Sequence, residues 1–318
     1  MKSIQFCTIL SIAMLVSGIG AASAQTVGYS DAIGQMGQAC GPDIAKFCKT
    51  TQLGDGRMQQ CLARSDASQQ CKSAMVALDS LIKKRAAARS AVPKICDADI
   101  RQYCAGMQIG DGNLMTCFDQ AKRRMSARCR QAVLDAGYET ALAPNQSTSQ
   151  VALDPNKIVQ NLQGGGATEI DVSRLRQMVA ASLADPSRSE RVNREPLIDQ
   201  LNNLAQFTIA IEFDFNSARI RPDSFRAVGL MADSLYSPYL QGYRFLIIGH
   251  TDGKGSREYN LKLSQQRADA IRAALINPFG ISRKRLESIG FGEEQLLDRA
   301  HPEAAENRRV QLINIGKP

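Results

Sequence analysis

The chain has 318 residues, a formal net charge of +8 at pH 7 and a pI of about 9.1, and it contains only two histidines. At roughly 100–200 residues per domain, this length predicts about two domains. The basic residues are spread along the chain without interleaved aromatic residues, which argues against nucleic acid as a partner. Metal-dependent hydrolysis needs a cluster of His and acidic ligands, so two histidines argue against it, and no cofactor is predicted.

Residues 1–24 are predicted to be a secretory signal peptide. Lys2 gives a basic start, an apolar stretch runs from Ile4 to Ala22, and Ala22-Ser23-Ala24 forms an A-x-A cleavage site. Cys7 does not lie at the cleavage point, so it is not expected to be a lipid-attachment cysteine. No later stretch approaches the roughly 20 apolar residues of a membrane span, so we expect an exported chain with no transmembrane segment after signal removal.

Residues 36–143 contain two copies of a four-cysteine unit. CGPDIAKFC and TQLGDGRMQQC in the first copy correspond to CDADIRQYC and MQIGDGNLMTC in the second, at a spacing of 56 residues. Eight cysteines remain after signal removal, and an even number in an exported chain indicates disulfides. The alternative is a metal site, but this half of the chain has no CxxC and no histidine. The eight are Cys40, Cys48, Cys61 and Cys71 in the first copy and Cys96, Cys104, Cys117 and Cys129 in the second.

Each copy is predicted to form a small helical hairpin. Ile44 and Phe47 lie at i and i+3, on one face of a helix, and Gly54-Asp55-Gly56 supplies a turn and a helix start. A unit of this size buries little core, so its disulfides are expected to act by restricting the unfolded state.

The hairpin geometry favours nested disulfides, although four cysteines allow three pairings. Nested pairing joins Cys40 to Cys71 and Cys48 to Cys61, and the second copy is expected to pair likewise. The unit resembles the cysteine-rich repeat of the Golgi-glycoprotein type. That resemblance implies an all-helical, disulfide-bonded module and implies little about a ligand.

Residues 144–205 are predicted to be a linker that carries amphipathic helices. Asp154-Pro155 is expected to open a short helix that stops at Gly164-Gly165-Gly166. Two further apolar stripes have helical spacing, and we expect these helices to pack on a flanking domain; a dedicated partner helix is the alternative. The stripes are Leu175, Met178, Val179 and Leu183, and then Leu197, Ile198, Leu201 and Leu204.

Residues 206–318 are predicted to form a compact sandwich in which helices cover a small mixed sheet. Phe207 to Phe215 alternates apolar and polar residues, as in a strand with one buried face. The expected elements that follow are a helix over 222–239, a strand over 243–250, a helix over 256–277 and strands near 285–291 and 309–315. The fold class is therefore α+β: a βαβαββ sandwich preceded by an all-α disulfide-bonded repeat module.

Several motifs of this region resemble the OmpA C-terminal-like family in order and spacing. They are Phe213-Asp214-Phe215-Asn216, Gly249-His250-Thr251-Asp252, Asn260, Leu263-Ser264, Arg267-Ala268, Gly292-Glu293 and Asn307-Arg308-Arg309-Val310. The family includes the periplasmic domains of outer-membrane protein A, of the peptidoglycan-associated lipoprotein and of flagellar-motor stator proteins. The resemblance implies a non-catalytic domain that holds the diaminopimelate residue of the peptidoglycan stem peptide.

The residue types support the same chemistry. Diaminopimelate presents an ammonium and a carboxylate at one end of its side chain. Asp252, at a strand end, suits the ammonium, and Arg267, on the following helix, suits the carboxylate because a guanidinium forks onto two oxygens. Asn260 precedes Arg267 by seven residues, or two helical turns, so the two face the same side. The resemblance adds Asn216 and Arg308 to the pocket.

Each of these residues also has a purely structural interpretation. Asp252 alone is more typical of a turn cap, and Arg267 of a solvated helix face. Arg308 and Arg309, on an edge strand, are typical of residues that keep the edge soluble. Lys254 departs from the family, whose members often carry a small polar residue at this loop position.

We expect a periplasmic, wall-associated protein that binds diaminopimelate-type peptidoglycan and anchors the cysteine-rich module to the wall. An envelope protein is a further candidate partner. A peripheral location at the outer membrane is an alternative that the sequence leaves open. One alternative is an envelope adhesin or stress factor that acts through the cysteine-rich module. A wall hydrolase is the less favoured alternative. His250 is expected to be structural and His301 lies in a polar loop, so neither histidine is suited to be the base of a catalytic triad.

Overall fold

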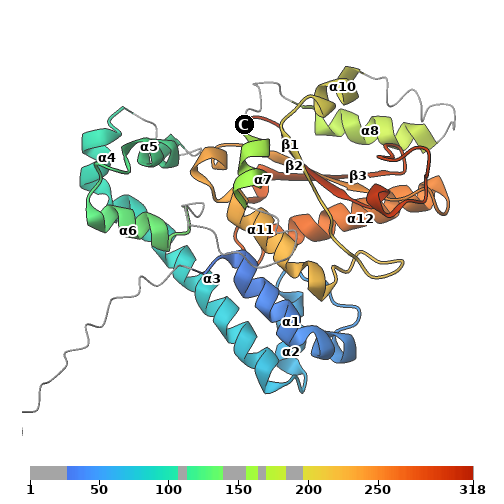
Figure 1. Cartoon of the computed structure of the whole chain (residues 1–318), viewed down its shortest axis with the longest axis horizontal. Helices are drawn as coiled ribbons and strands as arrows, with labels where there is room; N and C mark the ends of the chain where they lie inside the picture. Colours follow the sequence, from blue (N-terminus) through green and yellow to red (C-terminus); the bar gives the residue numbers. More distant parts are fainter. Residues whose placement is uncertain (1–26, 107–112, 139–154, 164–169, 184–195, 318) are drawn as a thin grey trace, which may run out of the picture.

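The computed structural model describes residues 27–106, 113–138, 155–163, 170–183 and 196–317 (Figure 1). The predicted signal peptide, the polar stretch after Pro144 and the glycines at 164–166 lie outside these residues. Within the described ranges, no helix has both the length and the apolar character that crossing a membrane requires.

The C-terminal region is built on a four-stranded mixed sheet in the order β1-β4-β2-β3. The strands are β1 (Gln206–Ile209), β2 (Phe245–His250), β3 (Leu286–Gly292) and β4 (Val310–Asn314). β1 and β2 both pair antiparallel with β4, and β2 pairs parallel with β3. Every residue of β2 is buried, as expected for a strand that is covered on both faces.

Two helices alternate with these strands, close to the predicted positions. α11 (Phe225–Leu235) follows the 3₁₀ turn η1 (Pro222–Ser224) and is followed by η2 (Pro238–Leu240). α12 (Arg257–Ile276) begins after Ser256, whose hydroxyl accepts a hydrogen bond from the Tyr259 N–H at 3.2 Å. Short 3₁₀ turns, η3 (Arg283–Arg285) and η4 (Ala305–Asn307), precede the last two strands. The predicted α+β class is confirmed.

The first strand is shorter than the predicted alternation. β1 ends at Ile209, which pairs with Val310, the first residue of β4, so no strand residue remains to pair with the chain beyond it. The chain turns back instead, and Phe213 forms an isolated antiparallel bridge with Ile220. Phe215, expected on a buried strand face, is fully exposed in this turn.

The predicted edge position of the last strand is wrong. β4 lies between β1 and β2, so it is an interior strand. Arg309, which immediately precedes it, is 9% exposed and donates from Nη2 to the Gln295 carbonyl at 2.9 Å. This arginine therefore holds a loop and does not serve as a solubilising residue at a sheet edge.

The two cysteine-rich repeats are helical and carry the expected nested disulfides. The first contains α1 (Tyr29–Phe47), α2 (Arg57–Arg64) and the start of α3 (Gln69–Ile95); the second continues with α4 (Asp97–Tyr103), α5 (Asn113–Ala121) and α6 (Ala127–Asp135). All four predicted pairs are present: Cys40–Cys71, Cys48–Cys61, Cys96–Cys129 and Cys104–Cys117.

The duplication extends to a shared side-chain cap. In the first repeat, the Asp43 carboxylate accepts hydrogen bonds from both the backbone N–H and the hydroxyl of Ser68, the N-cap of α3. In the second, Asp99 accepts the same two bonds from Ser126, the N-cap of α6, both at 2.7 Å. The two copies therefore fold through the same local contacts.

The first repeat shares a hydrophobic core with the C-terminal region, whereas the second has a core of its own. α1 packs lengthwise on α11, as Figure 1 shows in blue and light orange. Gly229 permits the close approach, because a Cβ atom there would lie 2.5 Å from the Cα of Ser30. At the start of α1, the Asp233 carboxylate accepts hydrogen bonds from the N–H groups of Tyr29 and Ser30, both at 2.9 Å.

The helices of the middle segment pack on the C-terminal region, as expected. α7 (Pro155–Leu162) joins the core on the side of α11. α8 (Val172–Leu183) and α10 (Pro196–Asn202) cover the opposite face of the sheet, where Leu246 and Ile289 are buried against them. Helices therefore lie on both faces of the sheet.

Candidate functional site

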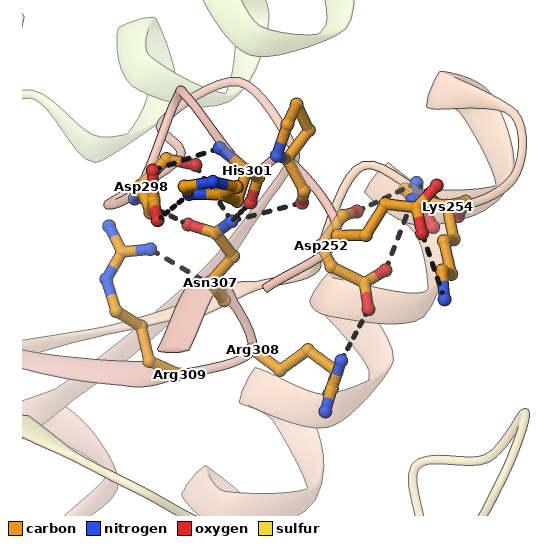
Figure 2. Close-up of polar contacts among 10 residues, drawn as sticks. Asp252, Lys254, Asp298, His301, Asn307, Arg308 and Arg309 are labelled. Atoms are coloured by element: carbon orange, nitrogen blue, oxygen red, sulfur yellow. Dashed lines mark hydrogen bonds and ion pairs between the residues drawn. The ribbon is translucent and has the colours of Figure 1, made fainter. Parts of the chain in front are cut away.

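The candidate site lies where β2 runs out into the loop that leads to α12. Asp252 is the second residue after β2, and its carboxylate is only 13% exposed. Oδ2 accepts a hydrogen bond from Arg308 Nη1 at 2.7 Å, and Oδ1 accepts one from the Lys254 N–H at 3.2 Å (Figure 2). The carboxylate is therefore fixed in direction, with one oxygen on a loop amide and the other on a guanidinium.

Asn260, on α12, holds this loop through hydrogen bonds. It is 2% exposed, and its Nδ2 donates to the carbonyls of Asp252 at 3.3 Å and Lys254 at 2.9 Å and to Glu293 Oε2 at 2.6 Å. Gly292 lets α12 come close, because its φ is 53° and a Cβ atom there would lie 2.9 Å from the Leu261 nitrogen. The amide of Asn260 is therefore buried and holds the loop that carries Asp252.

Arg267 lies on α12 and turns toward the loop before α11. Its Nε donates to the Ser217 carbonyl at 3.1 Å, and its guanidinium lies 4.8 Å from the centre of the Phe213 ring. Partial burial lowers the pKa of Arg267, the neighbouring Tyr259 raises it, Arg308 lowers it and Asp252 raises it. Arg308 and Asp252, which are hydrogen-bonded to each other, are therefore both near enough to act on the charge of Arg267.

Asn216 lies in the turn that Arg267 holds. It is exposed and has a φ of 54°, in the left-handed region that Asn tolerates better than most residues. The turn is closed by a 3.0 Å backbone hydrogen bond from the Asp214 N–H to the Arg219 carbonyl. The side chains of the same two residues form an ion pair. The Ser217 carbonyl then ties the turn to Arg267, so Asn216 borders the site.

Arg308 reaches Asp252 from a loop that Asn307 organises. Asn307 is fully buried, and its Oδ1 accepts from the Asp298 N–H at 2.9 Å. Its Nδ2 donates to the carbonyls of Asp298, His301 and Pro302 at 3.0–3.1 Å (Figure 2). The Gly253 N–H donates to the same Pro302 carbonyl at 2.8 Å, which joins this loop to the one that bears Asp252.

The two histidines have structural partners. His250 is 2% exposed and its Nε2 is hydrogen-bonded to the Gln311 side chain, and burial lowers its pKa well below the ordinary histidine value. His301 is exposed and pairs through Nδ1 with Asp298 Oδ2 at 2.8 Å, an interaction that lowers the pKa of Asp298. Among the described residues, no three His, Cys, Asp or Glu side chains are grouped so that they could hold a metal ion.

Sequence reasoning did not identify three residues that shape the site. Phe213 lies against the Arg267 guanidinium, the Ser217 carbonyl accepts from Arg267, and Tyr259 interacts with its charge. Tyr259 is 41% exposed and precedes Arg267 by eight residues, so helical spacing placed the two on nearby faces. Phe213 belonged to a motif of the family resemblance, but spacing gave no sign that it or Ser217 approaches Arg267, because that approach depends on the early end of β1.

The arrangement presents both charges on one surface. Asp252 offers a carboxylate, while Arg267 and Arg308 offer guanidinium groups, one half-buried and one about half exposed. Of the Arg267 nitrogens, Nε donates to the Ser217 carbonyl. A guanidinium has two further nitrogens, which can donate in parallel to a carboxylate. Such a surface is complementary to a small zwitterion.

Comparison with known proteins places this region in a family. Residues 212–309 match the model of the OmpA family. A peptidoglycan-associated lipoprotein of Pseudomonas aeruginosa is 36% identical over 102 residues, which cover 31% of this chain and 58% of the lipoprotein. Outer membrane porin F of the same organism is 34% identical over 103 residues, which cover 32% of this chain and 29% of the porin.

A solved structure is also similar in sequence to this chain. The peptidoglycan-associated lipoprotein from Burkholderia pseudomallei has 32% sequence identity and a TM-score of 0.28, with 33% of this chain and 87% of that chain covered. The chain thus spans somewhat more than half of one of these curated relatives and less than a third of the other. Residues 212–309 of this chain form a domain of the OmpA family.

Proposed function

We propose that the C-terminal domain binds peptidoglycan non-covalently and that its ligand is the diaminopimelate residue of the stem peptide. The observation that carries the proposal is the convergence of Asp252, Arg267 and Arg308 from three separate segments onto one surface. Two of the similar proteins are named for an association with peptidoglycan.

The chemistry of the ligand matches the three side chains. The side-chain ammonium of diaminopimelate donates to the Asp252 carboxylate, and the adjacent carboxylate accepts from the terminal nitrogens of Arg267. Arg308 already donates to Asp252, so it sets the orientation of this carboxylate and adds a second cation for the ligand carboxylate. Asn216, on the turn that Arg267 holds, borders the same ligand from the other side.

The proposal extends to the whole chain. We place the protein in the periplasm, associated with the wall and without a catalytic role, where it anchors its cysteine-rich module. The shared core of the first repeat and the OmpA-family domain supports the anchoring, because a repeat packed into that core is carried with the domain. We propose the following boundaries along the chain: a signal peptide over 1–24, the repeats over 36–143, a linker over 144–205 and the OmpA-family domain over 206–318.

Co-sedimentation with purified sacculi tests the proposal. The chain from Gln25 onward is mixed with sacculi that contain diaminopimelate, and the bound fraction is measured. We expect Asp252→Ala and Arg267→Ala each to abolish binding, because each removes one half of the zwitterion contact. The matched control variants are Asp79→Ala and Arg174→Ala, which remove exposed charges elsewhere and should bind like the wild type.

A second wall type separates the ligand from the wall as a whole. Sacculi whose stem peptide carries lysine in place of diaminopimelate lack the side-chain carboxylate, so we expect them to bind weakly. Equal binding to both wall types would exclude diaminopimelate as the ligand. Failure of the wild-type chain to sediment with either would exclude peptidoglycan binding.

A further inference from the structure

The second cysteine-rich repeat gathers most of its positive charge in one place. Residues 96–138 contain six Lys and Arg side chains and five Asp. Five of these cations lie at the corner where α5 leads into α6, which we call the basic corner. They are Lys122, Arg123, Arg124, Arg128 and Arg130.

The acidic side chains near the basic corner are already engaged. Asp119 forms an ion pair with Lys122 at 3.1 Å and accepts a hydrogen bond from the Tyr239 hydroxyl. Asp99 is 6% exposed and caps Ser126 through both oxygens. Arg123 and Arg128 are exposed, and neither forms an ion pair with any residue that the structure describes. The corner is therefore a surface of largely uncompensated positive charge.

The position of Arg128 opposes the stability of α6. α6 begins at Ala127 after the Ser126 cap, so Arg128 lies in its first turn, where the helix dipole already places positive charge. No acidic residue is present in that turn. Side chains that are placed against a local rule are expected where a function requires them.

The first repeat shows that the fold does not require this charge. It has the same aspartate–serine cap and the same nested disulfides. With the capping serines Ser68 and Ser126 aligned, however, its corner has two cations and one anion in place of five cations. The positions of Lys122, Arg123, Arg124, Arg128 and Arg130 are occupied by Arg64, Ser65, Asp66, Gln70 and Lys72.

We propose that the basic corner binds the phosphate groups of an anionic phospholipid surface. Exposed guanidinium groups donate two parallel hydrogen bonds to a phosphate, and clustered Lys and Arg side chains are attracted by anionic lipid headgroups. A protein partner fits less well, because protein interfaces have a core enriched in aromatic and apolar residues. None of the large hydrophobic side chains that are exposed in the described residues belongs to α5 or α6.

The basic corner and the candidate site lie at opposite ends of the molecule. Figure 1 shows α4, α5 and α6 at one end, and α8 with the adjoining end of α12 at the other. The site is at that end of α12, because Arg257, the first residue of the helix, donates to the Ser182 carbonyl of α8 at 3.1 Å. The two surfaces can therefore be occupied independently.

Vesicle co-sedimentation tests the proposal with the chain from Gln25 onward. Vesicles of neutral phosphatidylcholine are compared with vesicles that contain one fifth phosphatidylglycerol, at low and at physiological salt. We expect binding to the anionic vesicles alone, weakened by salt. The triple substitution Arg123→Ser, Arg124→Asp, Arg128→Gln installs the residues of the first repeat, and we expect it to lower the partition coefficient by at least about tenfold.

A charge-matched variant controls for net charge. Lys49→Ser, Arg64→Asp and Lys284→Gln change the net charge by the same amount at exposed positions outside the basic corner, and together they should leave vesicle binding near the wild-type value. Equal losses in the two triple variants would overturn the proposal, as would wild-type binding to neutral vesicles. Binding to an immobilised acidic polypeptide but not to vesicles would also overturn it and indicate a protein partner. The vesicles contain no peptidoglycan, so the result does not depend on the proposed wall binding.

Discussion

Arg308 and Asp252, 56 residues apart in the sequence, are joined by a 2.7 Å hydrogen bond between Nη1 and Oδ2. The two side chains differ in exposure, at 48% for Arg308 and 13% for Asp252. The carboxylate is therefore held in a nearly closed environment by a cation that solvent and ligands can still reach. Substitution of Arg308 should therefore weaken ligand binding at the site without abolishing it.

Substitution of Arg308 should reduce sacculus binding only in part. Arg308→Gln leaves Asp252 in place on its loop amide, and water reaches the Arg308 side of the ion pair and screens it, so the pair contributes little. We expect the dissociation constant for diaminopimelate-containing sacculi to rise about fivefold. Arg308→Lys should recover part of the loss, since it keeps the charge. A loss as complete as that of Asp252→Ala would contradict this secondary role.

Removal of the Asp233 carboxylate should destabilise the whole molecule. Asp233 accepts from two N–H groups at the start of α1 and pairs at 3.1 Å with Arg85, whose side chain is 7% exposed. Asp233→Ala leaves that buried guanidinium without its anion, so we expect a loss of about 3 kcal/mol in the free energy of unfolding. Urea denaturation measures it. Asp79→Ala removes an exposed ion pair with Lys83 and should change the value by less than about 0.5 kcal/mol.

The contact between α1 and α11 should not tolerate a methyl group at Gly229. A Cβ atom there would lie 2.5 Å from the Ser30 Cα, and backbone on a packed helix cannot move aside alone. We expect Gly229→Ala to lower the free energy of unfolding by about 1–3 kcal/mol. Gly41→Ala, also in a helix, meets its nearest atom at 4.0 Å and should change it by less than about 1 kcal/mol. Equal effects would show that α1 is not packed on α11.

Loss of one of the two long disulfides should destabilise the sheet of the C-terminal region, whereas loss of the other should not. Cys40–Cys71 and Cys96–Cys129 span 31 and 33 residues, so each is expected to contribute about 3–4 kcal/mol through the unfolded state. The first lies in the core shared with the C-terminal region, and the second in the separate core of its own repeat. Paired Cys→Ala substitution of the first should reduce hydrogen-exchange protection of β2, whereas the same change in the second should leave β2 protected.

Acid should destabilise the domain through His250. Burial lowers its pKa in the folded state well below the ordinary value of 6.5, so the unfolded chain binds a proton that the folded chain does not. Stability from this group is present above pH 6.5 and is lost as the pH falls from 6.5 toward the lowered folded-state pKa, by up to about 1.4 kcal/mol per pH unit. Stability curves at pH 7, 6 and 5 should be flatter for His250→Gln. A slope in His250→Gln as steep as that of the wild type would contradict this assignment.

Local patterns predicted most of the secondary structure and the disulfides. The apolar run of β2, the capped α12 and the duplicated cysteine spacing each follow from contacts within one element or one hairpin. Their positions in the structure differ from the predicted ones by a few residues. The meeting of Asp252 with Arg308 was expected from a family resemblance, which carried the long-range information that no periodicity contains.

Other features depended on long-range partners and left no local signal. The alternation from Phe207 to Phe215 predicted one long strand. β1 ends at Ile209 because its partner there, Val310, is the first residue of β4. Asn260 was expected to contact a ligand, and its burial became evident only with the loop folded over it. The contact of Tyr29 with Asp233 joins residues 204 positions apart, so the docking of the first repeat could not be read from either segment.

The helix α3 has a mechanical consequence for the proposed anchoring. Its 27 residues correspond to about 40 Å, and it runs without interruption from the first repeat to the second. Its Arg85 is fixed to the C-terminal region through Asp233, and the second repeat that follows it meets the same region again through Asp119 and Tyr239. α3 therefore bridges two points that are attached to the same body. A pull on the second repeat would load this helix, its buried ion pair and the contact of α5 with η2 together, without first straightening a slack linker.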